Sequence, residues 1–151
     1  MTTAFADSSA LVKTYVIEPG GSDVEAMHGL AVSALSRVEV VSALRRKQRS
    51  GELAVSQANA ICSAVAADFD DPAGGVAGLA PVGVSENLLQ DAAALLSRHA
   101  LSAADAVQLS SAMLARDADP GIATFVCFDV RLRQAAAIEG FRLVPPTLPA
   151  D

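Results

Sequence analysis

Tryptophan is absent from the sequence, and its 151 residues include one tyrosine, five phenylalanines and only two cysteines. Two cysteines cannot build a disulfide framework, which excludes the small disulfide-rich secreted domains. Cys62 and Cys127 both lie in apolar runs, where we expect buried free thiols. Because aromatic residues are so few, we expect a mainly aliphatic hydrophobic core.

Long apolar segments are missing as well. No uncharged apolar run approaches the roughly 18 residues of a membrane-spanning helix, and the N-terminal segment lacks the basic and apolar regions of a secretory signal. The sequence therefore predicts a cytoplasmic protein that does not contact a membrane. Hydrophobic residues make up 52% and charged residues 19%, which excludes disorder, and the length corresponds to one domain over residues 1–151.

Positive charge is scarce. The chain has 11 lysines and arginines against 17 aspartates and glutamates, which gives a net charge of −6. This balance excludes a broad basic surface that coats nucleic acid. It leaves open an enzyme that handles nucleic acid locally through metal ions.

Several catalytic motifs are also absent. The sequence has no G-K-[ST] phosphate loop, no G-x-G-x-x-G after a strand, no G-x-S-x-G elbow and no H-E-x-x-H. His28 and His99 have no ligand partners nearby in sequence, and a zinc site needs several, so we assign neither a catalytic role. Residues 68–75 begin like a calcium loop, but Pro72 and Ala73 break that pattern, so we expect a surface loop there.

What the sequence does contain is an alternation of short apolar runs with helical patterns. Continuous apolar strands that are each followed by a helix are typical of a parallel sheet buried on both faces. The expected strands are residues 3–6, 30–34, 80–84, 123–128 and 141–144. The expected helices are residues 8–17, 22–28, 36–50, 55–69, 86–98, 103–116 and 130–139. The pattern therefore predicts an α/β fold.

Four carboxylates stand at the starts of predicted helices: Asp7, Glu39, Asp105 and Asp129. Helix capping alone could account for each of them. Asp7 and Asp129 are good N-cap residues, and the other two stand three residues after Ser36 and Ser102, as in capping boxes with these serines as N-caps. An acid in the first helical turn also interacts favourably with the helix dipole.

Capping does not explain why so many predicted strands are followed by an acid. In an open parallel sheet the carboxyl ends of the strands meet at one edge, where ligands bind. If the first strand is central, Asp7, Glu39 and Asp129 converge on one cleft. Three or four converging carboxylates repel one another unless a cation joins them. Oxygen ligands of this kind suit Mg²⁺ or Mn²⁺. Two such ions can drive phosphodiester hydrolysis by a metal-activated water, without a histidine or serine nucleophile.

Three further residues are candidates for substrate binding: Ser8, Ser9 and Arg46. Arg46 follows Glu39 by seven residues, which places it on the same helix face about 10 Å further along. It could hold a substrate phosphate there, or simply belong to a solvated basic helix end. Ser8 and Ser9 could orient an acid, a metal-bound water or a phosphate, or serve only as polar residues of a first helical turn.

The acidic residues lie in segments that occur together in a known family. These segments are DSSALVK at 7–13, LSRVE at 35–39, LSAADAVQL at 101–109 and FVCFD at 125–129, and EGF at 139–141 precedes the last predicted strand. In this order they resemble the PIN-domain family, specifically the VapC-type toxins of type II toxin–antitoxin systems. The resemblance covers nearly the whole chain.

The resemblance implies a three-layer α/β/α sandwich with a five-stranded parallel sheet in the order 3-2-1-4-5. It also implies a Mg²⁺- or Mn²⁺-dependent endoribonuclease toxin, a homodimer, an RNA substrate and inhibition by a cognate antitoxin. The acidic quartet of the family matches Asp7, Glu39, Asp105 and Asp129. The sequence departs from the family pattern at Cys127 and Phe128, because a small or hydroxyl residue is more usual before the fourth acid.

Two other functions stay open at this point. The chain could be a non-catalytic PIN-like binding module whose acidic cleft docks an arginine-bearing partner. It could also be a phosphatase that forms an aspartyl-phosphate on Asp7, although many such enzymes carry a second aspartate two residues later, where this chain has Ser9.

Overall fold

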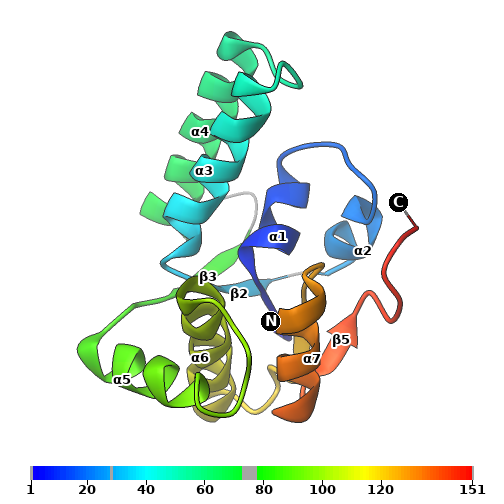
Figure 1. Cartoon of the computed structure of the whole chain (residues 1–151). Helices are drawn as coiled ribbons and strands as arrows, with labels where there is room; N and C mark the ends of the chain where they lie inside the picture. The colour runs from blue at the N-terminus through cyan, green and yellow to red at the C-terminus, as the bar shows by residue number, and fades with distance from the viewer. Residues whose placement is uncertain (1, 28, 73–77, 151) are drawn as a thin grey trace.

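A parallel β-sheet forms the middle layer of the fold (Figure 1). The computed structural model describes residues 2–27, 29–72 and 78–150. The strands are β1 (Ala4–Ala6), β2 (Leu30–Ser33), β3 (Leu79–Val82), β4 (Thr124–Val126) and β5 (Arg142–Val144). They pair in parallel in the order β3-β2-β1-β4-β5. The predicted five-stranded sheet with the order 3-2-1-4-5 is therefore confirmed, and β1 is its central strand.

Helices cover both faces of this sheet. They are α1 (Ser8–Leu11), the 3₁₀ turn η1 (Val12–Thr14), α2 (Gly21–Glu25), α3 (Ser36–Arg49), α4 (Val55–Asp70), α5 (Glu86–Leu95), α6 (Ala103–Ala118) and α7 (Val130–Ile138). One core lies between the sheet and α1–α4, and the other lies between the sheet and α5–α7. The predicted three-layer sandwich is thus confirmed. No helix in the described part of the chain is long and apolar enough to cross a membrane.

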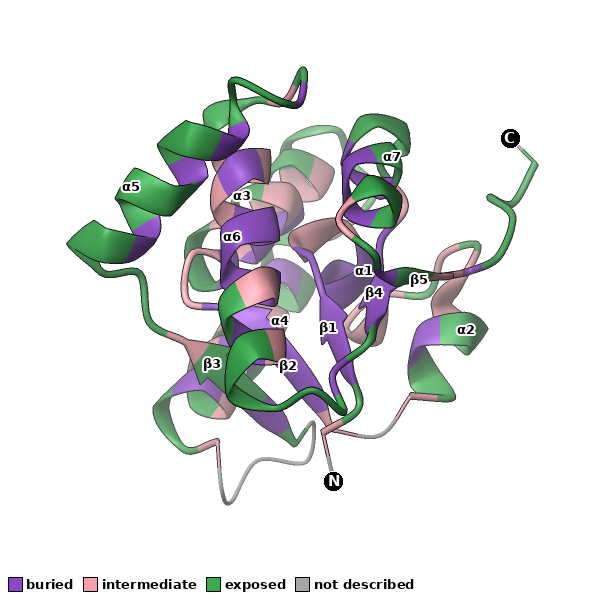
Figure 2. Cartoon of the chain, turned by 90° about the horizontal axis from the view of Figure 1, so that it is seen from below, coloured by how far each residue is buried: buried purple, intermediate pink, exposed green. Residues whose placement is uncertain are grey.

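Alternate residues of the strands supply the two cores. Ala6 and Val126 pack toward α1–α4, whereas Phe5 and Phe125 pack toward α5–α7 and stack with ring centroids 5.5 Å apart. Figure 2 shows the buried residues gathered in β1, β2 and β4 and on the inward faces of the helices. Cys127 is buried, as predicted, but Cys62 is only half-buried at the margin of its core.

The predicted helix over 55–69 and the predicted loop over 68–75 overlap at 68–69, and the structure has helix there. Residues 68–70 are the last residues of α4, whose buried face includes Ala58, Val65 and Phe69, so the loop prediction is wrong at its start. Phe69 is 8% exposed, and burying its ring outweighs the poor helix propensity of the aspartates beside it. Residues 73–75 of the predicted loop lie outside the described residues.

The predicted helices at 8–17 and 22–28 are shorter than expected. The first continues only as the turn η1, where the Thr14 hydroxyl donates to the Leu11 carbonyl at 2.8 Å, a local contact that competes with regular helix. The chain then reverses at Gly20, whose φ of 89° lies in the left-handed region that favours glycine, and α2 begins at the next residue. His28 lies outside the described residues.

Candidate active site

The four candidate carboxylates line one cleft beside the carboxyl ends of β1 and β4. The cleft has a volume of about 550 Å³. Its wall contains all the residues singled out from the sequence: Asp7, Ser8, Ser9, Glu39, Arg46, Asp105 and Asp129. The topology explains this, because a central β1 sends its chain into α1 at the same edge of the sheet where α3 and α7 also begin.

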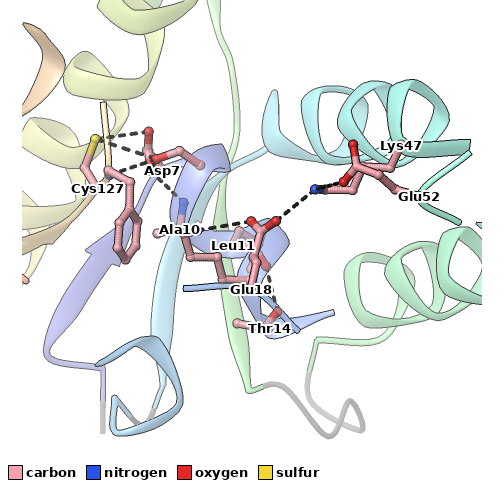
Figure 3. Close-up of polar contacts among 11 residues, drawn as sticks. Asp7, Ala10, Leu11, Thr14, Glu18, Lys47, Glu52 and Cys127 are labelled. Atoms are coloured by element: carbon pink, nitrogen blue, oxygen red, sulfur yellow. Dashed lines mark hydrogen bonds and ion pairs between the residues drawn. The ribbon is translucent and has the colours of Figure 1, made fainter. Parts of the chain in front are cut away.

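Asp7 caps α1 directly after β1, as predicted. Its Oδ1 accepts hydrogen bonds from Ser9 Oγ at 2.7 Å and from the Ala10 amide at 3.0 Å, and its Oδ2 accepts from Cys127 Sγ at 3.2 Å (Figure 3). Asp7 is only 4% exposed. Burial raises the pKa of Asp7 from 3.8 to about 6, although these hydrogen bonds act in the opposite direction. Asp7 therefore ionises only near neutral pH unless a cation binds beside it.

Glu39 is held by residues of other helices. Its Oε1 accepts hydrogen bonds from Ser8 Oγ at 2.9 Å and from Gln108 Nε2 at 2.7 Å. Gln108 is 1% exposed, and its Nε2 also lies 2.9 Å from the hydroxyls of Ser8 and Ser36, which are 2.8 Å apart. This network joins α1, α3 and α6 around one oxygen of Glu39.

Ser36 is not the N-cap that the sequence predicts. The helix α3 begins at Ser36 itself, and its N-cap residue Leu35 makes no side-chain capping bond. The Ser36 hydroxyl is buried against Ser8 and Gln108 instead. These contacts between distant segments compete with a local cap for the same hydroxyl and prevail here.

Asp105 and Asp129 start α6 and α7. The Asp105 amide donates to Ser102 Oγ at 3.1 Å, and Asp129 Oδ1 accepts from the Leu132 amide at 2.9 Å, so Ser102 and Asp129 are the predicted N-caps. Burial first, and then the negative charges of Asp129 and Glu39, raise the pKa of Asp105. Asp129 and Glu39 are therefore close enough to disfavour the ionisation of Asp105.

Ser9 and Cys127 connect Asp7 to the segment that follows β4. Ser9 Oγ donates to Asp7 and accepts from the Phe128 amide at 3.0 Å. Burial and the neighbouring Asp7 charge raise the pKa of the Cys127 thiol, so the thiol stays protonated and donates to Asp7. Cys127, the departure from the family pattern, thus supplies a hydrogen-bond donor where a hydroxyl is more usual.

Basic residues share the wall of the cleft with the acids. Arg46 lies on the wall that Glu39 also lines, as the helical spacing predicts. Lys13 and Lys47 line the cleft as well, and both pair with Glu18, at 3.1 and 2.9 Å respectively.

Among the charged and amide side chains of this wall, the residues that were not predicted as site residues are Lys13, Glu18, Lys47 and Gln108. Gln108 stands three residues after Asp105, and Lys47 stands eight after Glu39, so helical spacing could have placed both beside the acids. For Glu18, which lies between η1 and α2, no local pattern indicates a position in the cleft.

The acidic cleft meets the requirements of a divalent metal only in part. In the part of the chain that the structure describes, no three histidine, cysteine, aspartate or glutamate side chains lie close enough to hold one ion. Protein donors occupy both oxygens of Asp7 and one oxygen of Glu39. The chemistry of the donors still fits a hard cation, because carboxylates crowd one cleft and the pKa values of Asp7 and Asp105 are raised without a counter-charge.

His99 does not line the cleft. It is 8% exposed, and its Nε2 lies 2.7 Å from Glu139 Oε1, which Arg98 also contacts at 2.9 Å. His99 therefore contacts Glu139 within the fold and does not belong to the acidic cleft.

The sheet order and the acidic cleft at the carboxyl ends of the strands define a PIN-like domain. Two solved structures share the fold. A toxin–antitoxin complex from Klebsiella pneumoniae has a TM-score of 0.64 at 18% identity, and the VapC20 sarcin–ricin loop cleaving toxin of Mycobacterium tuberculosis has 0.61 at 17% identity. Each comparison covers 97% of this chain and 99% of the other. No family model matches the chain.

Sequence relatives narrow this class further. Ribonuclease VapC45 of Mycobacterium tuberculosis strain CDC 1551 / Oshkosh and ribonuclease VapC49 of strain ATCC 25618 / H37Rv are each 33% identical to the chain over 152 residues. The aligned region covers 98% of this chain and 99% of each relative. The chain belongs to the VapC ribonuclease family.

Proposed function

We propose that this protein is the endoribonuclease toxin of a toxin–antitoxin pair, and that it hydrolyses RNA phosphodiester bonds with the help of Mg²⁺ or Mn²⁺. The observation that carries the proposal is the gathering of Asp7, Glu39, Asp105 and Asp129 on one cleft at the carboxyl edge of the sheet. The relatives of this chain, VapC45 and VapC49, are named ribonucleases, which supports the same activity here. RNA as substrate implies action in the cytoplasm.

The first metal would be held by Asp7, Glu39 and Asp105, and Asp129 would complete the site or support a second ion. A divalent ion in such a site supplies a more acidic water and neutralises charge on the phosphate. The protein's own part is to hold the carboxylates in place. Ser9 and Cys127 orient Asp7 through hydrogen bonds to both of its oxygens.

The serines and Arg46 take different roles in this proposal. Ser8 and Ser9 are already hydrogen-bonded to Glu39 and Asp7, so they orient acids and do not bind a phosphate directly. Arg46 is exposed on the cleft wall and is available to a substrate phosphate. Asp7 is a poor candidate for a covalent phosphatase nucleophile, because it is buried and both its oxygens accept hydrogen bonds.

Partners follow from the family. The neighbour from Klebsiella pneumoniae is a toxin–antitoxin complex, which supports a cognate antitoxin for this chain. We also propose a homodimer, to be measured by sedimentation of the purified chain without antitoxin. A sedimentation coefficient of the monomer across the accessible concentration range would contradict the dimer.

Cleavage of total cellular RNA tests the proposed activity. The purified, antitoxin-free chain is incubated with Mn²⁺, with Mn²⁺ and excess EDTA, and in parallel as Asp105→Asn. We expect discrete products that disappear with EDTA and with the variant. Asp91→Asn is the matched control, since Asp91 is an exposed aspartate of α5 that does not line the cleft, and it should cleave like the wild type.

A non-catalytic docking module is the second candidate. It is favoured by the finding that no three acidic side chains among the described residues are close enough for one ion. Calorimetric titration with Mn²⁺ separates the two functions. A folded chain that neither binds Mn²⁺ nor cleaves RNA would be a docking module, whereas specific binding that Asp105→Asn abolishes would support the nuclease.

A further inference from the structure

Glu18 lies between two lysines on the wall of the cleft. Its Oε1 is 3.1 Å from Lys13 Nζ, and its Oε2 is 2.9 Å from Lys47 Nζ. The side chain of Glu18 is 20% exposed, that of Lys13 is 12% exposed and that of Lys47 is 23% exposed. All three line the cleft that holds the four carboxylates, and Figure 3 shows Glu18 beside α1 with Lys47 reaching it from α3.

The fold holds both ammonium groups in position. Lys13 Nζ lies 4.5 Å from the centroid of the Phe128 ring, which stabilises a cation at this place. Lys47 also pairs with Glu52 at 3.1 Å, from the side away from the cleft lining. Hydrogen bonds from Lys47 and Lys13 lower the pKa of Glu18 even though burial acts in the opposite direction, so its carboxylate is charged at neutral pH.

An RNA backbone in this cleft needs fixed positive charge. The acids on the wall repel its phosphates, and the basic residues of the lining are Lys13, Arg46 and Lys47. Two of these three cations pair with the single carboxylate of Glu18, whose one negative charge offsets part of theirs.

The geometry of that carboxylate matches a phosphodiester. Each carboxylate oxygen of Glu18 pairs with one lysine. The two non-bridging oxygens of a backbone phosphate can each pair with one ammonium group in the same way. Glu18 is partly exposed and lies outside any helix or strand, so its side chain can rotate into solvent without moving a regular element.

We propose that Lys13 and Lys47 form a binding subsite for a phosphate of the RNA backbone, and that Glu18 occupies this subsite until RNA displaces it. The inference rests on the proposed function, because it names a contact of the same RNA substrate. No covalent bond changes in this exchange: one anion replaces another on the two ammonium groups.

The test measures binding of a short, mixed-sequence single-stranded RNA by fluorescence anisotropy, in EDTA so that no cleavage occurs. Glu18→Gln removes the competing anion, so we expect RNA to bind about fivefold more tightly. Glu52→Gln is the matched control, because it removes the same charge from the same Lys47 but on the exposed side. We expect it to change the affinity by less than about twofold.

A double variant without the two lysines tests whether the expected increase in RNA affinity depends on them. In the variant Lys13→Met/Lys47→Met, RNA should bind more weakly than to the wild type, and adding Glu18→Gln should bring no gain. Thermal unfolding verifies the fold of each protein. If Glu18→Gln does not fold, Glu18→Asp takes its place, since it keeps the charge but is too short to reach both lysines, and tighter binding is again expected.

The outcomes separate this inference from the proposed function. Equal gains for Glu18→Gln and Glu52→Gln would show a general charge effect and overturn the subsite, as would unchanged or weaker RNA binding by Glu18→Gln. RNA bound by none of the proteins would overturn the RNA-cleaving function and the subsite with it, whereas RNA bound without the expected differences would overturn the subsite alone.

Discussion

Gln108 donates its side-chain amide to Glu39 across 2.7 Å, and so links α6 to α3 through two residues that are 69 positions apart in the sequence. The same nitrogen lies 2.9 Å from the hydroxyls of Ser8 and Ser36. The Gln108 Oε1 is buried and has no hydrogen-bond partner among the described residues. The amide is therefore oriented by what its nitrogen donates to, and Glu39 is its charged acceptor.

Replacing Gln108 by Met tests this residue as a positioning residue for Glu39. The variant loses the hydrogen-bond donor to Glu39, which lowers the free energy of unfolding. It also removes the buried Gln108 Oε1, which has no partner among the described residues, and this raises the free energy of unfolding. Each effect is on the order of 1–3 kcal/mol. We expect the free energy of unfolding to change by less than about 1 kcal/mol, while kcat for RNA cleavage falls about tenfold or more and KM changes little.

Gln134→Met is the control for that variant, because Gln134 is exposed on α7 and does not line the cleft. It should leave both kcat and KM unchanged. A Gln108→Met protein with wild-type kcat, or one whose loss of activity is explained by unfolding, would contradict the positioning role.

The raised pKa of Asp7 predicts a pH-dependent gain in stability for Asp7→Asn. The carboxyl titrates at about 6 in the fold against 3.8 as its ordinary value, so its ionisation destabilises the fold increasingly between these pH values and fully above pH 6. In EDTA, we expect Asp7→Asn to raise the free energy of unfolding by about 2–3 kcal/mol near pH 8 and by little near pH 4.

Urea unfolding of both proteins at the two pH values measures this difference. Asn caps a helix about as well as Asp, so loss of the cap does not mask the effect. Asp91→Asn, on the exposed face of α5, should show no such dependence on pH. The same change in stability at both pH values would contradict the burial of an ionisable Asp7.

Arg133 holds the C-terminal tail against the segment after β4, and its replacement should destabilise the fold. It is 7% exposed, and it donates to the Cys127 carbonyl at 2.8 Å and to the Pro145 carbonyl at 2.7 Å. Arg133→Met leaves these acceptors without their donor, so we expect the free energy of unfolding to fall by about 2–3 kcal/mol. Arg131→Met, at an exposed position two residues earlier, should stay within about 0.5 kcal/mol of the wild type in the same urea titration.

Two glycines with similar backbone angles provide a matched pair. Gly20 and Gly51 have φ of 89° and 84°, but a Cβ on Gly20 would overlap the Phe128 ring, whereas a Cβ on Gly51 would meet nothing within 4 Å. Gly51→Ala should cost about 1 kcal/mol through the left-handed backbone alone. Gly20→Ala should cost about 1–3 kcal/mol more, because the ring has to move. Thermal unfolding measures both, and equal losses would contradict the close packing of Gly20 on Phe128.

Much of the fold could be predicted because its signals are local. The strands are short apolar runs and the helices have regular apolar spacing, so the order of the elements along the chain can be predicted from the sequence. The acids Asp7 and Asp129 were found for the same reason, since each follows a predicted strand and caps a helix. At residues 68–69 the local patterns predicted both a helix and a loop, and the burial of Phe69 against the core decided for the helix.

By itself the sequence determined the class of fold and the residue types of the cleft, because hydrophobic periodicity and acids at predicted strand ends are properties of short segments. Only the tertiary structure decided how those residues are paired. The Ser36 hydroxyl accepts a hydrogen bond from Gln108 and does not cap its helix, and Glu18 pairs with both Lys13 and Lys47. Such contacts join segments that meet only when the sheet is ordered and its helices are packed, so no spacing along the chain encodes them.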